Sequence, residues 1–88
     1  MKLKYNFVTN KVADRIVAVT VGDDAKKFNG FIKMNDTGAF IFNMLRNDVT
    51  VEEIADAMKR EYDGVSEEEL RSTVSQFIEN LKKSDVLE

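Results

Sequence analysis

The segment from Phe28 to Phe42 constrains the fold most, because it joins a predicted strand to a predicted helix with almost no loop between them. Phe31 to Met34 is a short extended run, and Asn35 follows at once as a helix N-cap, whose side-chain oxygen accepts a hydrogen bond from a free backbone N–H. Asp36 adds negative charge at the positive end of the helix dipole, so the helix is predicted to begin there. One edge of a small sheet is therefore held beside a layer of helices.

The composition bounds the functions that the chain can support. At 88 residues it is expected to form a single domain, residues 1–88, and a domain of this size has little room for a deep internal active site. Cysteine and histidine are both absent, which removes thiolate metal sites, thiol nucleophiles and the commonest acid–base side chain. The acidic pairs and runs lack the alternating oxygen-ligand spacing of a calcium loop. We therefore predict no catalytic residue, no metal site and no cofactor.

Charge and hydropathy predict where the chain acts and on what. Residues 1–48 carry eight Lys/Arg against five Asp/Glu, whereas residues 49–88 carry five against eleven. A nucleic-acid reader shows the opposite distribution, with a basic stripe on its recognition helix. The basic N-terminal residues are not followed by the apolar run of a secretory signal, and no stretch approaches the ~20 apolar residues of a membrane span. We expect a cytoplasmic protein with no membrane partner.

Three extended segments precede three helices in the predicted order of elements. A run from Phe7 to Val12 and a β-branched run from Arg15 to Val21 are separated by two residues and should form a hairpin. Phe31 to Met34 is the third strand, reached through a polar connection over residues 22–27. Asn29-Gly30 is an alternative two-residue hairpin turn, because that dipeptide favours type I′ geometry.

Capping patterns define the second and third helices. Thr50 to Glu53 forms a capping box, which starts a helix running from Val51 to about Tyr62. Ser66 to Glu69 repeats the pattern and starts a helix from Glu67 to Lys83. In the first helix, Gly38 costs roughly 0.5–1 kcal/mol relative to alanine, which predicts the close approach of a neighbouring backbone.

The last predicted helix carries two stripes at the same spacing. The stripe expected to face the core consists of Leu70, Val74, Phe77 and Leu81. The stripe one residue, or ~100°, further round consists of Arg71, Ser75, Ile78 and Lys82. On residue types alone this second stripe is a solvated boundary with one partly buried isoleucine, or else the wall of a groove for an acidic or amphipathic peptide.

Five segments, in this order and spacing, resemble the PQQ-biosynthesis protein D family, whose domain is also called the RiPP recognition element. They are Phe28 to Gly30, Met34 to Ala39, Thr50 to Ile54, Glu61 to Asp63 and Val74 to Leu81. The resemblance implies an α+β fold in which a three-stranded antiparallel sheet is followed by three helices in a winged-helix-like arrangement. It also implies a non-catalytic protein that binds the leader of a ribosomally made precursor peptide and presents it to a modifying enzyme, often a radical SAM protein.

The family's mode of binding is strand addition, in which the peptide pairs with the exposed edge of the third strand and rests against the third helix. On this resemblance the second stripe becomes the wall of the groove. The residues predicted to bind peptide are Phe31, Ile32, Lys33, Met34, Arg71, Val74, Ser75, Ile78 and Lys82. Alternate residues of the third strand point to opposite faces, and the sequence leaves open which pair faces the core.

Two other functions fit the same pattern of elements. A winged-helix DNA-binding protein has a compatible content of strands and helices, but the acidic third helix suits phosphate contacts poorly. A small dimerising adaptor would instead pair the free strand edge with its own copy.

Overall fold

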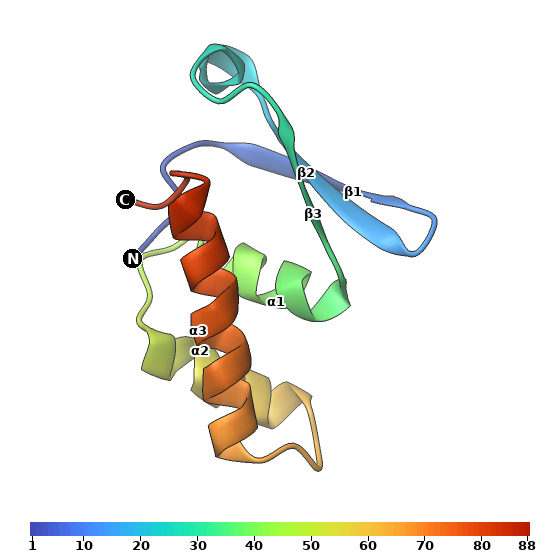
Figure 1. Cartoon of the computed structure of the whole chain (residues 1–88), viewed down its shortest axis with the longest axis vertical. Helices are drawn as coiled ribbons and strands as arrows, with labels where there is room; N and C mark the ends of the chain where they lie inside the picture. Colours follow the sequence, from blue (N-terminus) through green and yellow to red (C-terminus); the bar gives the residue numbers. More distant parts are fainter.

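The computed structural model describes all 88 residues and contains a three-stranded antiparallel sheet followed by three helices. The strands are β1 (Phe7–Val12), β2 (Arg15–Thr20) and β3 (Phe31–Met34), in the order β1-β2-β3. The β1–β2 hairpin projects to one side, and the three helices gather on the other side of β3 (Figure 1). The predicted α+β class and order of elements are confirmed.

The connections between the strands differ in kind. Ala13 and Asp14 form the two-residue turn between β1 and β2, with Ala13 in the left-handed region at φ 58°. Between β2 and β3 the chain makes a short 3₁₀ helix, η1 (Gly22–Lys26), and residues 27–30 then lead into β3. The alternative hairpin turn at Asn29-Gly30 is therefore wrong, since the connection between the strands is ten residues long from Val21 to Gly30.

The sheet has a buried face and an exposed face. Ala18 pairs with Ile32 and Ile16 with Met34, so these side chains share the face that packs on the helices, where Met34 is buried. The opposite face carries Phe31, which is 57% exposed. The orientation that the sequence left open is thus settled: Ile32 and Met34 point inward.

Local capping explains where the helices begin. The Asn35 side chain accepts a hydrogen bond from the Gly38 N–H at 2.8 Å, and α1 (Asp36–Met44) follows. Both bonds of the Thr50–Glu53 capping box are present at the start of α2 (Val51–Glu61). At the start of α3 (Glu67–Lys83) the Ser66 hydroxyl accepts from the Glu69 N–H, without the reciprocal bond of a full box.

The core lies where the inner face of the sheet meets the helices and the two ends of the chain. Its central side chains come from α1, α2 and α3, and fully buried examples are Phe42, Ile41, Leu45, Ile54, Met58 and Val74. The side of α3 that enters this core consists of Leu70, Val74, Ile78 and Leu81. Phe77, which the sequence assigned to the core, is only partly buried and packs at its margin.

The two chain ends are paired with each other beside the helices (Figure 1). Leu3 and Leu87 form an antiparallel bridge, and the Glu88 N–H donates to the Lys2 carbonyl at 2.8 Å. Val86 and Leu87 are buried, as expected for an apolar tail that folds back. No helix is both long and apolar enough to cross a bilayer.

Replacing Ile78 with alanine should destabilise the fold, because Ile78 is 3% exposed and its loss leaves a cavity in the core. We expect a decrease of about 2–5 kcal/mol in the free energy of unfolding, measured by urea denaturation. Lys82→Ala, on the same predicted stripe but exposed, serves as the control and should change it by less than about 0.5 kcal/mol. Equal effects of the two substitutions would contradict the observed rotation of α3.

Candidate functional site

The hydrogen bonding of β2 determines which backbone groups of β3 remain free. The Val21 N–H donates to the Asn6 carbonyl at 3.1 Å, so Val21 directs its backbone groups toward the side of β1. Successive residues of a strand direct these groups to opposite sides. Ala18 and Ile16, at odd separations from Val21, therefore direct theirs toward β3.

It follows that β3 presents a defined set of donors and acceptors at its outer edge. Ile32 and Met34, which pair with Ala18 and Ile16, use their N–H and C=O groups in the ladder. Phe31 and Lys33 consequently point theirs away from β2, where no further strand is present. Their four backbone groups are the hydrogen-bonding capacity that an added strand requires.

A hollow of about 320 Å³ lies beside this edge, between β3 and the C-terminal half of α3. We call it the strand groove. It is lined by Arg15, Ile32, Lys33, Met34, Asn35, Phe77, Asn80, Leu81 and Ser84. Apolar side chains from β3 and α3 thus lie next to the free backbone groups, together with two cations.

The residues predicted to bind peptide divide into two groups in the structure. From the strand, Ile32, Lys33 and Met34 line the strand groove, whereas the Phe31 side chain lies on the outer face of the sheet. None of the five residues predicted on α3 lines it, and these are Arg71, Val74, Ser75, Ile78 and Lys82.

Ile78, predicted as the apolar member of the groove wall, does not form that wall. Val74, predicted to lie on the core-facing stripe and also to bind peptide, has the first of these positions. Both lie in the core, Val74 at 0% and Ile78 at 3% exposure. Residues seven and eight positions after Leu70 both fall within the apolar arc of a helix, so the pattern was compatible with burial of Phe77 or of Ile78. The structure buries Ile78 and leaves Phe77 at the margin of the core. The face of α3 beside the strand groove therefore lies one residue before the buried side, and not one residue after it as expected.

The helix face that meets the groove was therefore missed by the sequence analysis. It runs through Phe77, Asn80 and Ser84, and the first two each lie one residue before a member of the buried side, Ile78 and Leu81. These residues carry no charge, although α3 is otherwise rich in Glu and Lys. The signal available in the sequence for this face was a run of uncharged polar residues at helical spacing with one aromatic residue among them.

The position of the Phe77 ring explains why residue 38 is a glycine. A Cβ atom at Gly38 would lie 2.8 Å from Cε1 of Phe77, which is closer than carbon atoms approach. The expectation of a neighbouring backbone at Gly38 is wrong, because the closest group is the Phe77 ring. The missing side chain in the first turn of α1 leaves space for this ring between α1 and the strand groove.

Arg71 is held on the side of α3 that faces α2. Its guanidinium donates to the Glu52 carboxylate at 2.6 Å and to Glu67 at 3.2 Å. The hydrogen bond from Arg71 lowers the pKa of the Glu52 carboxyl, and the two carboxylates raise the pKa of Arg71. Arg71 therefore links two helices and is not directed at the strand groove.

The site contains no group of three His, Cys, Asp or Glu side chains that could hold a metal ion. Its chemistry is that of hydrogen bonding along an edge strand and of apolar contact with a helix. The fold and site define a small α+β domain with an open strand edge beside its last helix. The chain belongs to the family described as coenzyme PQQ synthesis protein D (PqqD), whose sequence profile matches residues 10–87.

The structural comparison agrees with this family assignment at the level of the fold. The chain is similar to TbiB1, solved in complex with the TbiA(beta) leader peptide, with a TM-score of 0.76 and 23% sequence identity. The superposition covers 100% of this chain and 95% of that one. No curated protein matches the chain.

Gly38→Ala should destabilise the protein, because the new methyl group collides with the Phe77 ring. We expect a loss of about 1–3 kcal/mol in the free energy of unfolding. In a Phe77→Ala background the same substitution should cost clearly less, because the contact at 2.8 Å is gone and only Met34 Cβ at 3.2 Å and Asn35 Oδ1 at 3.3 Å remain close to the new methyl group. A double-mutant cycle by chemical denaturation measures the coupling, and additive effects would contradict the contact.

The ion pair of Glu52 should make a contribution to stability that disappears in acid. Because the pKa of Glu52 is lower in the folded state, this contribution is present above its unfolded value of about 4.3 and is lost as the pH falls through the folded value. We expect Glu52→Gln to lower the Tm at pH 7 and to lower it by less at pH 3, relative to the parent protein. Glu79→Gln, with no ion pair within the chain, is the control and should not show this difference.

Proposed function

We propose that this protein is a non-catalytic binding module for an extended peptide, the leader segment of a ribosomally made precursor. The peptide would be added to the sheet as a fourth strand at β3. The observation that carries the proposal is the free set of backbone groups of Phe31 and Lys33, located beside a groove with both apolar and polar lining residues. Membership of the PqqD family and likeness to a protein solved with a leader peptide support the same function.

The geometry of β3 defines what each peptide residue would do. Peptide residues opposite Phe31 and Lys33 would exchange N–H and C=O hydrogen bonds with them, each contributing about 0.5–1.5 kcal/mol net. The residue between them, opposite Ile32, would point its side chain to the inner face of the sheet, into the strand groove. Affinity would therefore come from the backbone and selectivity from alternate side chains.

Charge favours a peptide over nucleic acid as the ligand. Arg15 and Lys33 are the only charged residues in the lining of the strand groove. The Lys33 ammonium lies over the Phe31 ring on the outer face of the sheet, where it suits an acidic peptide residue at the free edge. The first turn of α3, in contrast, carries Glu67, Glu68 and Glu69. Such a helix end would repel the phosphate backbone, whose contacts dominate the affinity for DNA.

The bound leader would be presented to a separate peptide-modifying enzyme, for which a radical SAM protein is our proposal on the basis of the family resemblance. This partner would act on the part of the precursor that lies outside the strand groove. Co-purification of the chain with a candidate radical SAM enzyme, in the presence and absence of a leader peptide, tests this step.

A homodimer paired through two β3 edges would use the same donors and acceptors as the peptide. Peptide binding and dimerisation would then compete, and the apparent affinity would fall as the protein concentration rises. Light scattering at the concentrations used for peptide titration distinguishes a monomeric peptide binder from such a dimer.

Lys33→Pro should abolish most peptide binding while preserving the fold. Proline removes the Lys33 N–H, which is free at the sheet edge, and leaves the donors of the β2–β3 ladder in place. We expect a tenfold or greater increase in Kd, measured by fluorescence anisotropy with a labelled leader peptide that binds the parent protein. Lys33→Ala keeps the N–H and is the control, with an expected change below about threefold; equal losses in the two variants would exclude strand addition.

The peptide itself offers a second measurement. N-methylation of each amide in turn removes one donor without changing any side chain. We expect binding to be lost at two positions separated by one tolerant residue, because β3 directs its free groups outward at every second residue. A uniform tolerance of N-methylation would show that binding does not involve the β3 edge.

A further inference from the structure

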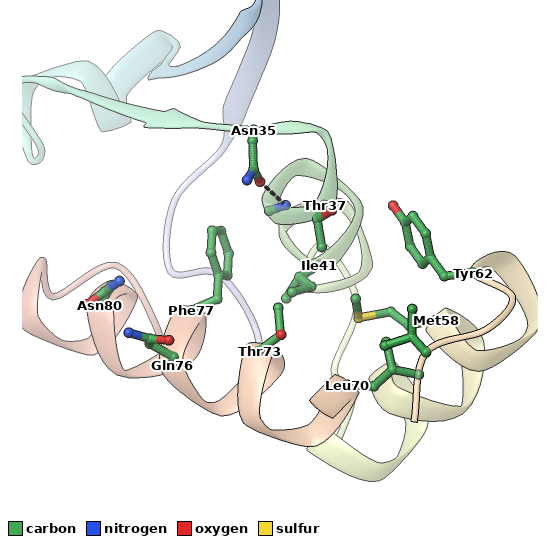
Figure 2. A pocket seen from close by; sticks show the side chains of 12 residues that line it. Asn35, Thr37, Ile41, Met58, Tyr62, Leu70, Thr73, Gln76, Phe77 and Asn80 are labelled. Carbon is green, nitrogen blue, oxygen red and sulfur yellow. Dashed lines mark hydrogen bonds between the residues drawn. The ribbon is translucent and has the colours of Figure 1, made fainter. Parts of the chain in front are cut away.

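A second hollow, of about 420 Å³, lies between the first turn of α1, the end of α2 and the N-terminal half of α3 (Figure 2). We call it the helix compartment. Its apolar lining consists of Ile41, Met58, Tyr62, Val65, Leu70 and Phe77. Val65, in the connection between α2 and α3, is 37% exposed, and part of this apolar surface is thus open to solvent.

The helix compartment adjoins the strand groove. Asn35, Phe77 and Asn80 line both hollows. Figure 2 shows the Phe77 ring rising from α3 toward Asn35 and the start of α1. A peptide leaving β3 at its Met34 end would thus come directly to the helix compartment.

The two hollows together are longer than β3. Along α3 they extend from Leu70 to Ser84, which is about 21 Å at the rise of an α-helix. The four residues of β3 cover only about 13 Å. The difference corresponds to roughly two or three extended peptide residues beyond the strand-paired segment.

The lining of the helix compartment carries no charge. This sets it apart from the strand groove, with its Arg15 and Lys33, in a chain that is 33% charged overall. Its polar members include Thr37, Thr73 and Gln76, and no hydrogen bond within the chain engages these three side chains. A charged group would lose hydration here without gaining a partner, whereas an apolar group would cover exposed apolar surface.

We propose that the helix compartment is a second subsite for the same peptide, which takes a bulky, uncharged apolar side chain located two or three residues outside the segment paired with β3. This inference rests on the proposed function. Phe77 separates the two subsites, and the absence of a side chain at Gly38 sets the position of its ring. The chain would read its ligand at two points, one beside the strand and one between the helices.

The test uses an mRNA-displayed library of random 15-residue peptides as its probe, selected on the full chain. N-methylation of an enriched peptide locates the strand-paired residues, and alanine substitution then locates side chains that contribute outside them. We expect an apolar residue at the stated separation, whose replacement by alanine weakens binding about ten- to hundredfold.

Thr73→Trp fills the helix compartment from an exposed position that does not line the strand groove. It should weaken binding of the enriched peptide at least tenfold, and it should have little effect on binding of the peptide whose apolar residue is already alanine. Ser72→Trp adds the same side chain at an exposed position that lines neither hollow, and should bind both peptides as the parent does. Circular dichroism verifies that both variants fold.

The outcomes separate the two proposals. The second subsite would be overturned if binding shows the alternating sensitivity to N-methylation, but no apolar residue beyond the paired segment contributes and Thr73→Trp has no effect. Strand addition would then still stand. Absence of the alternating pattern in every enriched peptide would overturn the proposed function itself. If Thr73→Trp does not fold, the alanine substitutions in the peptide decide the question alone.

Discussion

The rotation of α3 about its own axis is the constraint on which the site depends. Burial of Leu70, Val74, Ile78 and Leu81 sets this rotation. The same rotation directs Arg71 to the carboxylates of Glu52 and Glu67. Because successive residues lie about 100° apart on a helix, a seam displaced by one residue would present other residues of α3 to the strand groove in place of Phe77 and Asn80.

Much of the fold could be predicted from the sequence because its signals are local. Asn35, Thr50 and Ser66 each cap the helix that follows, and a cap depends only on residues within one turn. Which face of α3 lines the site depends on whether Phe77 or Ile78 is buried, and the local sequence does not determine this. Phe77 and Ile78 both suit an apolar arc, and the space left by Gly38 decides between them, through a contact that spans 39 residues of sequence.

The open edge of β3 is a feature that small proteins usually suppress, because unpaired strand edges promote association. Here the exposed edge is only four residues long and carries a lysine, and α1 begins immediately beyond it. The edge is thus too short to recruit strands without help from the neighbouring helix. Selective pairing would need both parts, the backbone groups of β3 and the uncharged face of α3.

The alternation of backbone groups along β3 has a consequence for how such a protein diverges. The donors and acceptors of Phe31 and Lys33 belong to the main chain, so no side-chain replacement other than proline removes them. Under the proposed function, substitutions on the strand other than proline would leave pairing intact, whereas substitutions at Thr73, Phe77, Asn80 or Gly38 would change the peptide preference. The ability to pair with an added peptide strand would then be retained wherever the fold is retained. Which peptide is bound would depend separately on a few side chains of the helices.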